Sequence, residues 1–196
     1  MTDSQWLLIS VSTAGASASL RVTVWRQLKA LGALYLHQSV CVLPARAGTR
    51  RSVAALTERV RQGGGSVRTL SILVDDPEHE AQLRAELQAA RDGEYAEVLE
   101  RFPSFFDELE TETARGRTTF EELEESEADL ARFRTWLTKI AARDYFNAAT
   151  GEQARAELAR AEQALAAFAD LAMTSHETST KAAPGPRLRA VRKAST

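Results

Sequence analysis

The sequence has only one cysteine, Cys41, among its 196 residues. A single thiol cannot form an internal disulfide, and by itself it cannot supply the ligands of a zinc site. No apolar run approaches the roughly 20 residues that span a bilayer, and the N-terminus lacks the positive region of a signal peptide. These absences predict a cytoplasmic protein that does not interact with a membrane.

Signatures of common enzyme classes are also lacking. The sequence contains no phosphate-binding glycine loop, no nucleophile elbow and no metalloprotease helix. No helix-turn-helix signature stands out either, so any contact with DNA would depend on backbone electrostatics more than on base readout. We therefore predict a protein that has no cofactor, binds no metal and is not an enzyme.

Charge, in contrast, is abundant and unevenly distributed. Residues 1–76 hold nine Lys or Arg against four Asp or Glu, residues 77–173 hold eleven against twenty-two, and residues 174–196 hold five against one. The formal net charge of −2 therefore conceals a basic head, an acidic body and a basic tail. This segregation favours different surroundings for the three parts, or contact between head and body.

The first 76 residues predict a small α+β domain. Ser19 is the expected N-cap of its first helix, and Gly32 is the expected stop. Hydrophobic periodicity predicts, in order, strand 6–13, helix 19–31, strand 34–44, helix 51–62 and strand 67–74. Because each helix has one apolar stripe, both should pack on one face of the sheet. This is the ferredoxin-like pattern, lacking its last strand or borrowing it. The main alternative is a doubly wound parallel sheet, but the first turn lacks the glycine fingerprint.

After Pro77 the composition predicts helices almost throughout, with an interruption at Gly93 and a break at Pro103. Thr119 and Glu122 have the spacing of a capping box. Two heptad-like seams follow and favour a helical hairpin or a dimer arm: Leu123, Leu130, Phe133, Leu137 and Ile140, then Ala154, Leu158, Ala161, Leu165 and Phe168. We thus divide the chain into a ferredoxin-like βαβαβ domain at 1–76, an all-helical C-terminal extension at 77–173 and a disordered basic tail at 174–196.

Four segments carry a resemblance to a known family. They are "WLLISV", "SLRVTVWRQLKALGALYLHQSVCVLPA", "LTERVRQGGGSV" and "ARDYFNAATGEQARAELARAEQAL". Together they resemble the N-terminal domain of the chromate resistance regulator ChrB over roughly residues 5 to 171. The sequence is similar also to the ferredoxin-like middle domain of the phenylacetate repressor PaaX, and more remotely to CRISPR spacer-acquisition nucleases.

The resemblance implies a bacterial cytoplasmic protein that helps to control a chromate efflux operon, with chromate as effector. It also implies a homodimer formed through the sheet domain. The chain ends soon after its helical part, so we expect it to lack the second domain that the family uses in sensing. In the remote nucleases an Asp near the end of the first strand holds a metal ion, and "SVSTAG" has none.

A basic set marks the first helix and the loop after the second strand, and we select it as the candidate contact surface for DNA or an oxyanion. Planar guanidinium groups suit both ligands because two donors can bind two oxygens at once. The set comprises Arg21, Arg26, Lys29, Arg46, Arg50 and Arg51. The alternative is an ordinary solvated helix face, with Arg21 lying over Trp25 and the other cations pairing with the acidic helices.

The second predicted strand has a mixed face formed by Tyr35, His37, Ser39 and Cys41. It could stack bases, but cover by a helix or a dimer mate is the favoured interpretation. On one strand His37 and Cys41 would lie about 13 Å apart, too far to share a metal ion. Cys41 is interpreted as a buried small hydrophobe.

Three functional hypotheses follow. The first is a dimeric, non-enzymatic regulator that binds DNA or an operon partner through its basic head and tail. The second is a protein-interaction module in which the acidic helical hairpin carries the function without DNA. The third is a protein that binds chromate directly or reacts with it.

Overall fold

The computed structural model describes residues 5–116 and 118–182. Within it the chain forms two compact units. The first comprises the described residues up to Val98 together with Thr135–Arg155, and the second comprises Leu99–Arg134 together with the described chain from Ala156. Each unit is described separately below.

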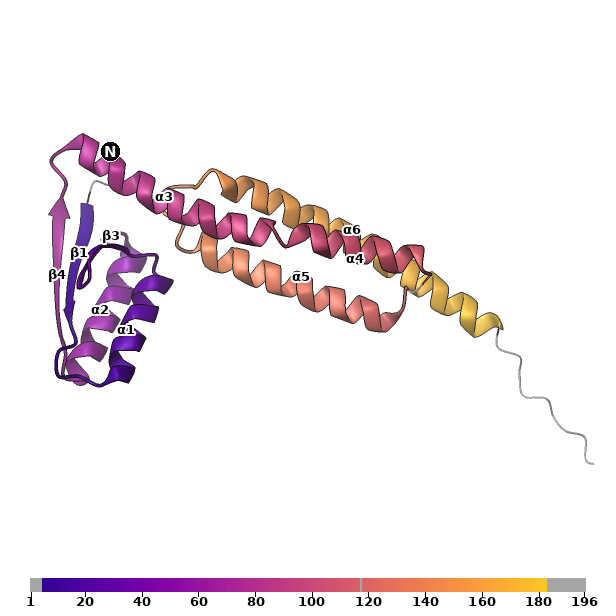
Figure 1. Ribbon diagram of the computed structural model, residues 1–196, viewed down its shortest axis with the longest axis horizontal. Helices are drawn as coiled ribbons and strands as arrows, with labels where there is room; N and C mark the ends of the chain where they lie inside the picture. The colour runs from indigo at the N-terminus through magenta and orange to yellow at the C-terminus, as the bar shows by residue number, and fades with distance from the viewer. Residues whose placement is uncertain (1–4, 117, 183–196) are drawn as a thin grey trace, which may run out of the picture. The chain divides into compact units, whose positions relative to one another are not determined.

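The first unit is built on a four-stranded antiparallel sheet (Figure 1). Its strands are β1 (Gln5–Ser12), β2 (Leu34–His37), β3 (Val40–Pro44) and β4 (Ser66–Leu73). They lie in the order β2-β3-β1-β4, and every neighbouring pair is antiparallel. Leu8 of β1 is paired with Val42 on one side and with Leu70 on the other. β2 and β4 are therefore the two edges of the sheet.

The predicted single strand at 34–44 is wrong, because the structure folds this segment into the hairpin β2–β3. Gln38 and Ser39 form the turn, and a register shift lies between Tyr35 and His37. The turn has neither glycine nor proline, so the alternation of apolar and mixed residues continues through it and gives no sign that the strand ends. The resulting order, strand-helix-strand-strand-helix-strand, is the ferredoxin-like order. The α+β class is confirmed, and the strand expected to be lacking or borrowed comes from this chain.

Helices α1 (Ala18–Ala30) and α2 (Ala47–Gln62) both cover one face of the sheet, as predicted (Figure 1). Their apolar stripes meet β1 residues in one buried cluster. Its members include Leu20, Val24 and Leu28 of α1, Val53, Leu56 and Val60 of α2, and Leu7 and Ile9 of β1. Gly63, after the end of α2, lies against Leu20 near the start of α1, so the two helices run antiparallel.

Both helices begin earlier than predicted. The N-cap of α1 is Ser17 rather than Ser19, and its hydroxyl accepts a hydrogen bond from the Leu20 amide at 3.2 Å. Either serine suited the pattern, but Ser17 places the cap three residues before the first buried leucine. α2 begins at Ala47 instead of Arg51, since Thr49 is buried and its hydroxyl donates to the Pro44 carbonyl at 2.6 Å.

The opposite face of the sheet is also apolar, and the segments that follow the sheet cover part of it. Trp6 and Val42 are buried there with Leu87 of α3 (Pro77–Leu99). The Phe146 ring lies 5.8 Å from the Trp6 ring between centroids. α3 passes through Gly93 without the predicted interruption, because good helix formers flank this glycine and Tyr95 beyond it is buried.

A charged cluster joins α3 to the segment after α5 within the first unit. Arg91 is buried at 6% exposure, and the Glu94 carboxylate lies 2.9 Å from its Nε and 3.0 Å from Nη2 of Arg143. Gly32, which ends α1, has a φ of +70°. A Cβ atom on Gly32 would lie 2.4 Å from Nη1 of Arg91 and 3.1 Å from Cβ of Arg143. A left-handed backbone and a close approach thus both require glycine at this position.

The second unit is helical and contains α4 (Phe102–Ala114) with parts of α5 (Phe120–Ala141) and α6 (Thr150–Ala182). Phe133 of α5 packs on Phe102 and Phe105 of α4, at 4.8 and 5.8 Å between centroids. Arg134 of α5 pairs with Glu162 of α6 at 2.7 Å. The predicted hairpin therefore has a third helical partner, α4, which carries Pro103 in its first turn.

Most seam positions are buried as predicted, while Leu123 and Leu158 are half-buried. The Thr119 hydroxyl accepts from the Glu122 amide at 3.3 Å, which is the N-cap half of the predicted capping box. Residues 174–182 continue α6 instead of starting a disordered tail, and 183–196 lie outside the described residues. No helix in the described chain is both long and apolar enough to span a bilayer.

Gly32→Ala should destabilise the protein more than Gly15→Ala. Both glycines have positive φ, but a Cβ on Gly15 would meet nothing within 4 Å. Gly15→Ala should therefore cost only the left-handed strain, about 1–2 kcal/mol. Gly32→Ala should cost at least about 1 kcal/mol more, because the buried Arg91 guanidinium and the Arg143 side chain must shift to make room for the Cβ atom. Urea unfolding of both variants tests this, and equal losses would contradict it.

Candidate nucleic-acid interface

The first unit is strongly basic where the sheet and its two covering helices lie. Residues 5–74 contain nine Lys or Arg and one acidic residue, Glu58. Every ion pair found between described residues involves positions from 76 onward. The predicted pairing of these cations with the acidic helices therefore does not occur among the described residues, and the positive charge of this surface is not neutralised.

Four of the six predicted residues are exposed on the two covering helices, and Arg21 also lines a small hollow between α1 and the sheet. Arg21, Arg26 and Lys29 lie on α1, and Arg51 lies in the first turns of α2. Because α1 and α2 are antiparallel, the end of α1 that carries Arg26 and Lys29 lies beside the start of α2. The cation over the Trp25 ring is Lys29, 5.2 Å from its centroid, rather than the predicted Arg21.

The other two predicted residues are held by the fold. Arg50 donates to the Ser71 hydroxyl at 2.9 Å and to Oε1 of Gln5 at 3.1 Å, so it links α2 to β4 and β1. Arg46, the N-cap of α2, donates to the Tyr145 carbonyl, and its guanidinium lies 5.3 Å from the Tyr145 ring centroid. These contacts fix the orientation of both guanidinium groups.

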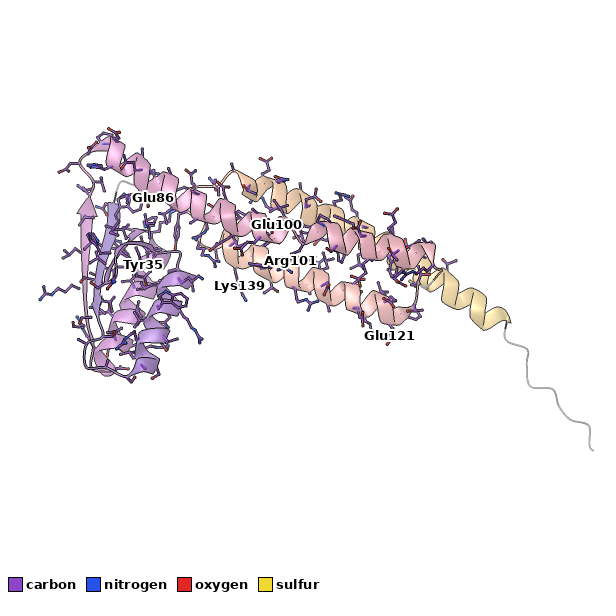
Figure 2. The ribbon with its side chains drawn as sticks, viewed as in Figure 1. Tyr35, Glu86, Glu100, Arg101, Glu121 and Lys139 are labelled. Carbon is purple, nitrogen blue, oxygen red and sulfur yellow. The ribbon has the colours of Figure 1, made fainter. Side chains whose placement is uncertain are left out.

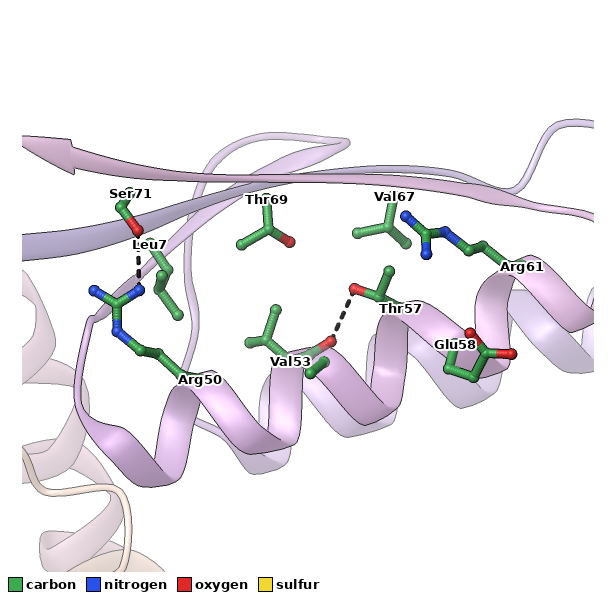
Figure 3. A pocket seen from close by; sticks show the side chains of 10 residues that line it. Leu7, Arg50, Val53, Thr57, Glu58, Arg61, Val67, Thr69 and Ser71 are labelled. Carbon is green, nitrogen blue, oxygen red and sulfur yellow. Dashed lines mark hydrogen bonds between the residues drawn. The ribbon is translucent and has the colours of Figure 1, made fainter.

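Arg50 also closes one end of a groove between α2 and the edge strand β4 (Figure 3). The groove has a volume of about 460 Å³, and Arg61 projects over its other end. Thr57 and Thr69 lie between the two arginines above an apolar floor, while Glu58 lies on the helix side. Arginines and hydroxyls spaced along an edge strand can donate to successive anionic groups.

Arg61 and Arg84, which line cavities of this unit, were not selected by the sequence analysis. Arg61 lines the groove. In the sequence, its position in the last turn of α2 indicated only a favourable interaction of its positive charge with the helix dipole. Arg84 of α3 lies 4.6 Å from the Phe146 ring centroid, in a second cavity that Arg46 also lines. In the sequence, the only feature near Arg84 is Glu80, four residues earlier, and this spacing indicates an ordinary ion pair within one helix.

The hairpin divides the predicted mixed strand face between β2 and β3. Its residues therefore lie opposite one another across two strands instead of along one strand. Tyr35 of β2 is paired directly with Cys41 of β3, while His37 is paired with Val40. Cys41 is buried under the helix layer, in the cluster that α1 and α2 form with the sheet. Tyr35, His37 and Ser39 are exposed, so cover of the whole face by a helix or a dimer mate stays a prediction.

Carboxylates of the helical segments do not assemble a metal site. Figure 2 shows Glu86 of α3 and Glu121 of α5 projecting outward, and both are exposed. Desolvation and the nearby carboxylate of Glu112 raise the pKa of Glu122. Among the described residues, no group of three or more His, Cys, Asp or Glu side chains could hold a metal ion.

Sequence comparisons identify the family of the chain. A family model described as "Protein ChrB, N-terminal" matches residues 21–179, which is most of the chain. The chain belongs to the ChrB N-terminal family. It is 34% identical over 97 residues to Protein ChrB of Cupriavidus metallidurans (strain ATCC 43123 / DSM 2839 / NBRC 102507 / CH34), a match that covers 50% of this chain and 29% of that protein. The predicted family is confirmed, and the alignment spans under a third of this ChrB relative.

Cys41 should be unreactive in the folded protein. Burial raises the pKa of its thiol from 9.0 to about 11, so little thiolate exists near neutral pH. We expect a thiol reagent to modify Cys41 at pH 7.5 only after urea is added. Because the thiolate forms more readily in the unfolded chain, the free energy of unfolding should fall as pH rises from 9 toward 11. Rapid modification of the native protein would contradict this.

Proposed function

We propose that the chain is a chromate-resistance-associated transcriptional regulator that binds DNA through the outer surface of α1 and α2. Membership of the ChrB N-terminal family supports the link to chromate resistance. The single observation that carries the DNA contact is the basic surface of residues 5–74, with nine cations, one carboxylate and no ion pair among the described residues. Such a surface attracts a polyanion mainly through release of its counterions.

The contact has a mixed chemical character. Arg26, Lys29 and Arg51 supply exposed cations at one end of the helix layer, and Trp25 is 51% exposed beside them. Guanidinium and ammonium groups would grip phosphates, while the indole would pack on sugars or base edges. This mechanism requires no cofactor and no catalytic step, and it fits a cytoplasmic protein. We therefore place the chain among non-enzymatic regulators, with chromate as the effector of the response.

Replacing Arg21, Arg26 and Arg51 together by Ala should weaken binding to the DNA upstream of the gene. None of the three side chains makes a hydrogen bond or ion pair with another described residue, so the fold should be unaffected. If all three contact phosphates, the slope of log affinity against log salt should decrease by about 2–3. Fluorescence anisotropy at several salt concentrations measures this slope.

The matched control replaces Arg101, Arg115 and Arg132 by Ala, which removes the same charge from the second unit. This control should keep the wild-type salt slope. Equal weakening by both triple variants would show that net charge alone governs binding. Absence of salt-dependent binding in the wild-type protein would reject the DNA contact and favour the protein-interaction module of the acidic helices.

We also propose that the chain forms a homodimer through the edge strand β4. This strand is eight residues long, has a sheet partner on one side only among the described residues, and exposes Leu70 by 56% and Leu73 by 64%. An exposed edge with apolar side chains favours pairing with another strand. A second copy would supply an identical strand in antiparallel orientation about a two-fold axis.

Leu70→Lys should convert the dimer to a monomer, since charge on an edge strand opposes strand pairing. Leu171→Lys serves as control, because Leu171 is similarly exposed, at 46%, but lies on α6. Light scattering coupled to size-exclusion chromatography reports the mass of each. A wild-type monomer of 21.5 kDa at high concentration would reject the dimer.

A further inference from the structure

A second cavity of the first unit, separate from the groove of Figure 3, is lined by two arginines. Its volume is about 380 Å³, and its charged side chains are Arg46 at the start of α2 and Arg84 of α3. Gln5, Tyr145, Phe146 and Asn147 complete its polar and aromatic lining. None of the described residues that line the cavity carries a carboxylate.

The two guanidinium groups converge on the same ring. Cζ of Arg84 lies 4.6 Å from the Phe146 centroid, and Cζ of Arg46 lies 5.8 Å from it. The two Cζ atoms are therefore no more than about 10 Å apart, and both arginines line the same cavity. Phe146 is itself fixed, because its ring packs on the buried Trp6 and its carbonyl accepts from the Gln88 amide at 2.9 Å.

Hydrogen-bonding capacity remains on both arginines. A guanidinium has five N–H donors. The Arg46 guanidinium makes one hydrogen bond to a described residue, at the Tyr145 carbonyl, and the Arg84 guanidinium makes two, both to Oε1 of Glu80. Gln5, which also lines the cavity, accepts from Arg50 through Oε1, and its NH₂ group donates to no described residue. These side chains therefore offer the cavity several donors, which suits a ligand that only accepts.

We propose that this cavity is a binding site for a tetrahedral dianionic oxyanion of the phosphate or sulfate type, bridged by Arg46 and Arg84. Arg84 has a carboxylate partner in Glu80, whereas Arg46 pairs with no carboxylate among the described residues, so the two arginines retain net positive charge there. The anion would accept from both guanidinium groups and from the Gln5 amide. The cavity is larger than the bare anion, which leaves space for water or for the organic group of a phosphate monoester.

This site is distinct from the proposed DNA contact, which uses Arg21, Arg26 and Arg51 on the helix surface. Occupation would tie the start of α2 to α3 through a shared ligand. The proposal does not depend on the chain binding DNA, and its experiment contains no DNA in the first step. Its failure can therefore be told apart from a failure of the regulatory proposal.

The test is calorimetric titration of the full chain with inorganic phosphate, sulfate and chromate at constant ionic strength, beside Arg84→Gln and Arg46→Gln. Each substitution removes an ionic donor, so affinity should fall at least tenfold in both variants. Arg68→Gln is the matched control, since Arg68 is exposed on β4 and does not line the cavity. It should bind as the wild type does.

Circular dichroism and urea unfolding show whether the Arg46 variant, which loses a contact to Tyr145, still folds. If it does not, Arg84→Gln alone decides the outcome, because Arg84 is half-exposed and bonded only within α3. Binding unchanged in Arg84→Gln, or equally weak binding in all four proteins, would overturn the site.

A competition experiment with a phosphate monoester and a short DNA duplex then distinguishes the possible sources of the anion. If the monoester competes with free phosphate and the duplex does not, the site is assigned to a small molecule. Competition by the duplex alone would overturn the small-anion site.

Discussion

Burial of Trp6 against Phe146 is the contact on which much of the first unit depends. β1 is apolar on both faces, so α1 and α2 cannot bury all of it, and the chain must return to the second face. The segment at 144–147 does so, and it brings the Tyr145 carbonyl and the Phe146 ring to Arg46 and Arg84. The Tyr145 hydroxyl also donates to the Leu31 carbonyl at the end of α1. The need to bury both apolar faces of β1 thus connects the sheet, the helix layer and the arginine-lined cavity.

Charge is used differently in the two parts of the sequence. In the acidic region the arginines are mostly matched with carboxylates three or four residues away, as in Arg84–Glu80 and Arg160–Glu157. Such exposed pairs contribute little to stability, but they leave no concentrated field. In residues 5–74 the cations face a single Glu, so their potentials add. The difference favours a long-range attraction for polyanions at the sheet unit and ordinary solubility at the helices.

The sequence was sufficient for the fold class because periodicity survives at most elements, and Leu20, Val24 and Leu28 are buried as their spacing predicted. The sequence did not predict the structure correctly where no local residue pattern marks a turn or a continuous helix. The Gln38–Ser39 turn has no turn residue that breaks alternation, and Gly93 lies in a helix that its neighbours sustain. The candidate site was half predictable, since exposed helix cations such as Arg26 follow from amphipathic spacing. That Arg84 would meet Phe146, sixty-two positions later, is a tertiary fact that no local pattern encodes.

The place of Cys41 has a consequence for durability. This only thiol of the chain lies between the sheet and the helix layer at 1% exposure. An exposed thiol would be the first group of the chain to lose electrons to an oxidant. Enclosure of Cys41 keeps the sulfur away from such chemistry, and because the sequence has one cysteine there is no partner thiol for an internal crosslink. The packing between the sheet and its two covering helices can thus persist unchanged under oxidising conditions.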